Sequence, residues 1–204
     1  MTQYNIIAES QEYTVVAEFD HVATPAEAYQ SEADLEKEFI RLLGEQGYEY
    51  LPIHKEADLI FNLRDQLEKL NHYHFTDNEW EHFFNECIAN KNDDIVAKTA
   101  KIQDDYIQVL KRDTGESQNI KLIDKDNIHN NFVQVINQYV EEGGNYDTRY
   151  DVSILVNGLP LVHIELKRRG VQLKEAFNQI NRYQRDSFWA GCGLYEYVQI
   201  FVIS

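Results

Sequence analysis

Two carboxylates and a lysine occur on one predicted strand hairpin, in the segment RYDVSILVNGLPLVHIELKRR at residues 149–169. Asp151 lies in the first apolar run, and Glu165 and Lys167 end the second. Charges are costly in such β-branched runs unless they are paired or bind a metal. Paired carboxylates suit Mg²⁺, and a nearby lysine can position an attacking water or offset developing phosphate charge. These residue types therefore indicate metal-assisted hydrolysis of a phosphodiester.

The register of the hairpin decides whether these side chains meet. Alternation along the strands gives two apolar sets, which are Val152, Ile154 and Val156 in the first strand and Val162, Ile164 and Leu166 in the second. If both sets face the same core, Asp151 lies on the same face as Glu165 and Lys167. A two-residue turn of Asn157 and Gly158 alone would break this match. The sequence therefore predicts an odd-length loop or a bulge, for example a three-residue loop over 156–158 with Gly158 at positive φ.

A different arrangement remains open from these residues alone. An unrelated α/β protein with a solvated cluster of salt bridges would contain the same three residue types. In that case Asp151 and Glu165 would diverge in space, so their separation distinguishes the two interpretations.

The rest of the chain is predicted to form helices and strands around this hairpin. Strands are expected at 13–19, 48–53, 107–112, 119–124, 131–140 and 195–204. Helices are expected between Ser31 and Gly47, over 58–70, after Thr76, and across Leu173–Tyr183. The segment before residue 107 is expected to be a polar connection. This order predicts an α/β fold with a central mixed β-sheet flanked by helices.

Composition limits the class of protein. The chain has 204 residues, enough for one compact domain, and a formal net charge of −16 that argues against nucleic acid as a partner. However, residues 167–185 contain six Lys and Arg against one acidic residue. No apolar run is long enough to span a membrane, and no signal segment is evident. The two cysteines form no C-x-x-C pair, which favours reduced thiols in a cytoplasmic protein.

Several motifs together resemble one nuclease family. Asp151-x₁₃-Glu165-Leu-Lys167 resembles the signature of the PD-(D/E)xK nucleases, although Tyr150 replaces the proline. Residues 35–50 resemble the first helix of that fold, and residues 179–183 resemble its Q-x-x-x-Y motif. Segments 132–138, 149–170 and 175–188 are similar to the N-terminal nuclease domain of type I restriction enzyme R subunits (HsdR).

The resemblance implies a restriction-endonuclease-like site. Asp151 and Glu165 would ligate Mg²⁺, and Lys167 would position the water or stabilise the transition state. Glu36 would be an additional acidic residue, unless it is a solvent-facing residue of its helix.

Other residues are implied to contact or support the DNA. Gln179 and Tyr183 would contact the DNA backbone or support the catalytic lysine, although Tyr183 also fits an apolar helix stripe. The candidate phosphate contacts, unless they only make the surface soluble, are Arg168, Arg169, Arg182 and Arg185.

The resemblance also implies a larger assembly. Residues 1–204 would be the N-terminal endonuclease domain of a longer chain with downstream ATP-dependent translocase domains. Methyltransferase and specificity subunits would be its partners in the cytoplasm of a bacterium or archaeon, and its substrate would be unmethylated foreign double-stranded DNA. The sequence contains no G-x-x-x-x-G-K-[ST] loop, so ATP is expected only at domains outside it. The alternatives are a catalytically silent docking module and another PD-(D/E)xK nuclease for repair or junction resolution.

Overall fold

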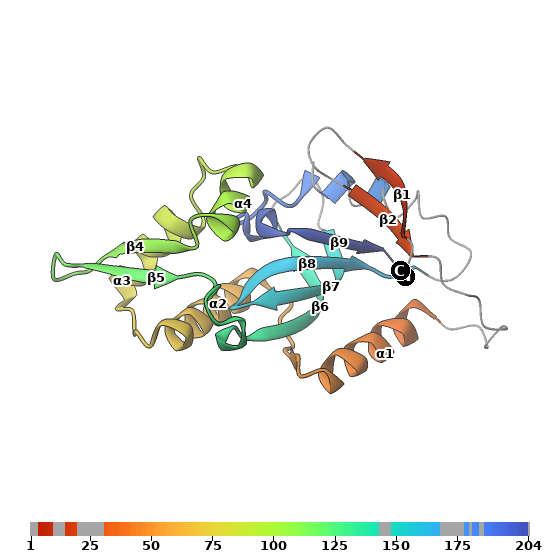
Figure 1. Ribbon diagram of the computed structural model, residues 1–204, viewed down its shortest axis with the longest axis horizontal. Helices are drawn as coiled ribbons and strands as arrows, with labels where there is room; N and C mark the ends of the chain where they lie inside the picture. Colours follow the sequence, from red (N-terminus) through yellow and green to blue (C-terminus); the bar gives the residue numbers. More distant parts are fainter. Residues whose placement is uncertain are drawn as a thin grey trace.

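A five-stranded mixed sheet forms the centre of the computed structural model, with strand order β3-β6-β7-β8-β9 (Figure 1). The described residues are 4–9, 15–19, 31–142, 148–167, 178–179, 181–183 and 186–203. The strands of this sheet are β3 (Glu49–Tyr50), β6 (Val133–Glu141), β7 (Thr148–Val156), β8 (Leu159–Glu165) and β9 (Ile200–Ile203). The inner pairs β6–β7 and β7–β8 are antiparallel, and the outer pairs β3–β6 and β8–β9 are parallel. The predicted central mixed sheet is therefore confirmed.

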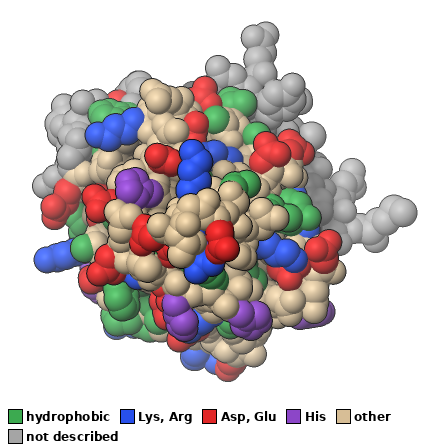
Figure 2. Space-filling model, turned by 90° about the vertical axis from the view of Figure 1, so that its left-hand side faces the viewer, with side chains coloured by type: hydrophobic (Ala, Val, Ile, Leu, Met, Phe, Trp, Pro, Cys, Tyr) green, Lys and Arg blue, Asp and Glu red, His purple; other side chains and the backbone are tan. Residues whose placement is uncertain are grey.

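Two antiparallel strand pairs lie outside this sheet. They are β1 (Tyr4–Glu9) with β2 (Val15–Phe19), and β4 (Ile107–Lys111) with β5 (Ser117–Lys121). The β4–β5 hairpin projects from one end of the molecule, at the left of Figure 1. Figure 2 views this end, where acidic and basic side chains are interspersed and do not form a patch of one sign.

Helices cover both faces of the central sheet. They are α1 (Glu32–Glu45), α2 (Glu56–Asn71), α3 (Asp77–Phe83) with its π-helical continuation η1 (Phe84–Ile88), and α4 (Ile95–Gln103). Short 3₁₀ turns occur at η2 (Ile128–Asn130) and η3 (Leu194–Tyr197). The predicted start signals are present, since the Ser31 side chain accepts from the Asp34 N–H and Thr76 and Glu79 form a capping box. None of the described helices is long and apolar enough to cross a membrane.

The two faces of the sheet pack in two separate clusters. On one face, Leu43 of α1 packs with Val135, Val152, Ile164 and Leu166. The other face forms the larger cluster with α2, α3, α4 and η3. Its buried members include Leu59, Leu63 and Leu67 of α2 and the aromatic residues Trp80, Phe83 and Phe84. Most of the predicted apolar set on the hairpin faces α1, whereas Val156 packs against the larger cluster.

The hairpin obtains its register from a two-residue turn and a bulge, and not from the three-residue loop given as an example. Its turn has two residues, Asn157 and Gly158, with φ of +50° and +84°. Leu155 pairs with Pro160 whereas Ile154 pairs with Val162, so the extra residue that corrects the register is in β8, after residue 160. α2 packs directly on this turn. A Cβ on Gly158 would lie 2.6 Å from the Cα of Leu63.

Three predictions of local structure were wrong. The expected polar connection contains α4. The apolar period of this helix is hidden because its buried face includes Lys98, which donates to Glu196 and to the Gly193 carbonyl. The strand expected at 48–53 is reduced to two residues. The strand expected at 195–204 begins as the buried 3₁₀ turn η3, and only residues 200–203 are extended.

Candidate active site

The bulge in β8 sets the register of the hairpin so that its charged side chains lie close together. Val152 pairs with Ile164, so the next residues along the two strands, Asp151 and Glu165, lie opposite each other on one face. The Leu166 N–H donates to Oδ2 of Asp151 over 3.0 Å, and Nζ of Lys167 lies 3.2 Å from Oε2 of Glu165. The arrangement contradicts the interpretation in which the two carboxylates diverge.

The two carboxyls differ in their affinity for protons. Burial raises the pKa of Asp151 to about 6, and the charge of Glu165 adds to the shift. Burial also opposes ionisation of Glu165, but its interactions with His163, followed by those with Lys167, outweigh burial and lower the pKa of this residue. At neutral pH the two facing carboxyl groups are therefore both ionised.

His163 is a member of this site that the sequence interpretation did not identify. Its Nε2 lies 2.9 Å from Oε1 of Glu165, and both side chains are fully buried. Alternation along β8 places the two residues on the same face, which is the only signal of this contact in the sequence.

Glu36 is hydrogen-bonded to side chains of β6 in the central sheet, and not to the two hairpin carboxylates. Its Oε1 accepts from Nδ2 of Asn137 over 2.6 Å, and its Oε2 accepts from the side-chain amide of Gln138. Gln138 adopts φ of +52° within β6, a conformation that is strained for a residue with a side chain. Glu36 is therefore not a plain solvent-facing residue, and its role as an additional acidic residue stays a prediction.

Gln179 and Tyr183 contact each other through a hydrogen bond from the amide of Gln179 to the hydroxyl of Tyr183. Burial raises the pKa of Tyr183 to about 12, and the charges of Glu165 and Asp151 contribute to the shift. The Tyr183 hydroxyl is therefore close enough for the charges of the two carboxylates to raise its pKa, and it stays protonated. Its ring is buried against Tyr150 and Phe188, so the predicted core packing is also present.

Arg182 is the one predicted phosphate contact that can be placed. Its exposed guanidinium lies over the ring of Tyr183, 5.9 Å from the ring centre. Arg168, Arg169 and Arg185 lie outside the described residues, as does most of the helix expected over 173–183.

The donor set at the hairpin fits a hard divalent cation. Asp151 and Glu165 supply carboxylate oxygens from adjacent strands, and a cation between them would relieve the repulsion that adds to the effect of burial on the Asp151 pKa. No group of three or more His, Cys, Asp or Glu that could hold a metal ion occurs among the described residues. Two carboxylates suffice for Mg²⁺, which usually keeps several of its waters.

Glu141 is a second carboxyl with a perturbed pKa. Burial, followed by the charges of Glu56 and Glu142, raises the pKa of Glu141 to about 9. A Cβ on Gly191 would contact both Glu56 and Glu141, so these two carboxyl groups approach the same point. None of the three hairpin residues accounts for this shift, and Glu141 is therefore separate from the carboxylate site.

The fold and the site together define a restriction-endonuclease-like domain. A mixed sheet flanked by helices presents two carboxylates and a lysine from one central hairpin.

Comparison with known proteins gives the family. The family described as type I restriction enzyme R protein N terminus matches residues 29–204. The chain is 47% identical over 199 residues to the EcoprrI endonuclease subunit of Escherichia coli, covering 97% of this chain and 63% of that protein. It is 40% identical over 181 residues to the SsaAORF53P endonuclease subunit of Staphylococcus saprophyticus, covering 86% of this chain and 18% of that protein. Both relatives are named type I restriction enzyme subunits.

The chain belongs to the family of type I restriction enzyme R protein N termini. It spans about two thirds or less of the length of these relatives.

Proposed function

We propose that this chain is the Mg²⁺-dependent endonuclease domain of a type I restriction R subunit, which hydrolyses phosphodiester bonds of unmethylated double-stranded DNA. The observation that carries the proposal is the meeting of Asp151, Glu165 and Lys167 on one face of the hairpin. The names of the relatives agree with this activity.

Each hairpin residue has a separate task in this proposal. Asp151 and Glu165 would hold the cation, which supplies Lewis acidity and a more acidic water when bound. The Leu166 N–H holds one oxygen of Asp151 in place. Lys167 lies beside Glu165 with its side chain 19% exposed, so its ammonium group can reach a water or a phosphate oxygen at the surface.

The DNA contacts and partners are part of the same proposal. Gln179, Tyr183, Arg182 and the adjacent Arg168 and Arg169 would contact the DNA backbone or support the lysine, and Glu36 would add an acidic group. Residues 1–204 would form one domain of a longer chain, with ATP-dependent translocase domains following. Methyltransferase and specificity subunits would complete the complex in the cytoplasm.

The test compares wild type with Lys167→Ala in the subunit assembled with its methyltransferase and specificity partners, on unmethylated plasmid DNA. We expect cleavage to fall by at least about 100-fold, because a charge that acts in the transition state is removed. ATP hydrolysis should continue, since the motor lies elsewhere in the proposed assembly.

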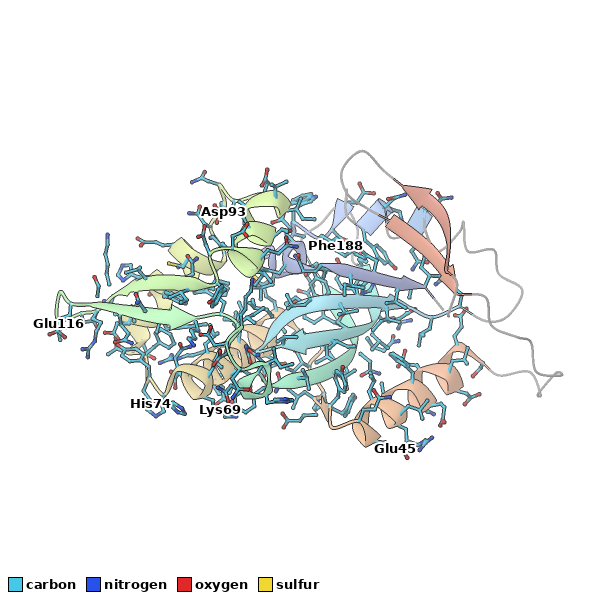
Figure 3. The ribbon with its side chains drawn as sticks, viewed as in Figure 1. Glu45, Lys69, His74, Asp93, Glu116 and Phe188 are labelled. Carbon is cyan, nitrogen blue, oxygen red and sulfur yellow. The ribbon has the colours of Figure 1, made fainter. Side chains whose placement is uncertain are left out.

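Lys69→Ala is the matched control. Lys69 is a half-exposed lysine in an ion pair with Asp65 on α2, and Figure 3 shows it far from the end of β8. This variant should cleave as wild type does. Normal cleavage by Lys167→Ala would contradict the site and favour a silent docking module.

A further inference from the structure

His163 is completely buried, and five aromatic rings lie around it. The rings of Tyr150, Tyr183, Phe188, Tyr195 and Phe201 surround it, all of them steeply inclined to the imidazole plane. Their centres lie between 5.1 and 6.4 Å from that of the imidazole. Figure 3 shows Phe188 near β9. A phenylalanine would fill such an enclosure without burying any polar atom, so packing alone gives no reason for an imidazole.

The two ring nitrogens of His163 have different surroundings. Nε2 lies 2.9 Å from Oε1 of Glu165, whereas Nδ1 is buried and has no hydrogen-bond partner among the residues that the structure describes. An N–H at Nδ1 would be a buried donor without an acceptor, and the bare Nε2 of that neutral tautomer would have no proton to donate to Glu165. The contacts therefore favour the tautomer with its proton on Nε2, donating to Glu165.

This hydrogen bond fixes one oxygen of Glu165 and orients the other. Oε1 is held by the buried ring, and Oε2 lies beside the Lys167 ammonium group. With both contacts in place, the carboxylate cannot rotate freely about its last torsion angle. Partners that hold a metal-binding side chain in this way commonly change metal affinity by about 10- to 100-fold.

We propose that His163 is a positioning residue for Glu165, holding Oε1 so that Oε2 is presented to the divalent cation. This inference rests on the proposed function, because it assumes that Glu165 binds the metal. The aromatic rings pack around the imidazole, whose hydrogen-bond partner among the described residues is Glu165.

Two substitutions at this position separate positioning from packing. His163→Phe keeps an aromatic ring but removes the donor. His163→Gln fills the aromatic enclosure less well but retains an N–H donor near the position of Nε2. Isothermal titration of the purified protein with MnCl₂ measures the affinity, and thermal unfolding without metal measures the integrity of each variant. We expect His163→Phe to bind Mn²⁺ about 10- to 100-fold more weakly, and His163→Gln to bind within several-fold of wild type. A packing role requires the reverse order.

Two reference variants distinguish a failure of the proposed metal site from a failure of the positioning role of His163. If Asp151→Asn and Glu165→Gln bind Mn²⁺ as tightly as wild type, the proposed metal site itself is wrong. If they lose binding while His163→Phe retains wild-type affinity, only the positioning role is overturned. It is also overturned if His163→Gln binds no better than His163→Phe.

A measurement on the wild-type protein covers the case in which the variants do not fold. Long-range ¹H–¹⁵N spectra of the histidine ring identify the nitrogen that bears the proton. The proposal requires the proton of His163 on Nε2. A proton on Nδ1 with a bare Nε2 would leave Glu165 without a donor and would overturn it.

Discussion

Asp151 illustrates how a buried strand alters a single carboxyl. Burial and the opposing Glu165 raise its pKa from 3.8 to about 6, so the folded protein binds this proton more tightly than the unfolded chain does. The stability gained from the proton is complete below pH 3.8 and is lost as the pH rises through about 6. At neutral pH the ionised Asp151 therefore destabilises the metal-free protein, and a bound cation would reverse this effect.

Asp151→Asn should therefore stabilise the protein when no metal is present. We expect a gain of about 1 kcal/mol at neutral pH, reduced from the full value of the shift because the carboxyl is partly exposed. Urea unfolding as a function of pH measures it, and the gain should disappear at a pH below the ordinary pKa of the aspartate. Added Mg²⁺ should stabilise wild type but not Asp151→Asn. An equal effect of Mg²⁺ on both proteins would place the ion elsewhere.

The hairpin and the helix above its turn position the site. The Asn157 side chain is buried and bonds to the Leu122 carbonyl and to the Phe132 N–H, while Gly158 lies against α2. The turn is thus fixed on both sides, and the bulge that follows sets Asp151 opposite Glu165.

Gly158→Ala should disrupt this element. The substitution places a Cβ 2.6 Å from the Leu63 Cα at a residue whose φ is +84°, so both steric overlap and backbone strain oppose it. We expect a loss of stability of about 3 kcal/mol or more in urea unfolding. Gly115→Ala is the control, since Gly115 has φ of +88° but no atom within 4 Å of the added Cβ. It should lose only about 1–2 kcal/mol, and equal losses would show that α2 does not constrain the turn.

The sequence predicted this element in part. Alternation correctly required a loop or bulge and placed Asp151 with Glu165, because a period of two is a local property of a strand. The bulge in β8 could not be located, since alternation shows that a residue must be added but not where along the hairpin it is added. His163 was missed for a similar reason, because its aromatic enclosure comes from residues distant in the chain. Helix α4 was missed because Lys98 finds its buried partners 95 and 98 residues further along the chain.

The net charge of the whole molecule opposes tight binding of DNA by this chain alone. The chain has a formal net charge of −16, and acidic and basic side chains are mixed on the face in Figure 2. We infer that the partners and motor of the proposed assembly supply most of the affinity for DNA.

The purified protein alone should therefore bind duplex DNA weakly. We expect a dissociation constant of about 10 µM or weaker at about 150 mM salt, because the net charge repels the phosphates. Fluorescence anisotropy with a labelled duplex measures it, and repetition at lower salt checks that the remaining affinity is electrostatic. Submicromolar binding that does not respond to salt would contradict this account.

The most direct test of the central claim is to locate the cation itself. Crystals of the protein grown or soaked with Mn²⁺ and measured at the manganese absorption edge would give an anomalous difference map. The account predicts a peak at about 2.2 Å from one oxygen of Asp151 and one of Glu165, and no peak there in Glu165→Gln. A fully occupied Mn²⁺ site elsewhere, with none between these two carboxylates, would contradict it.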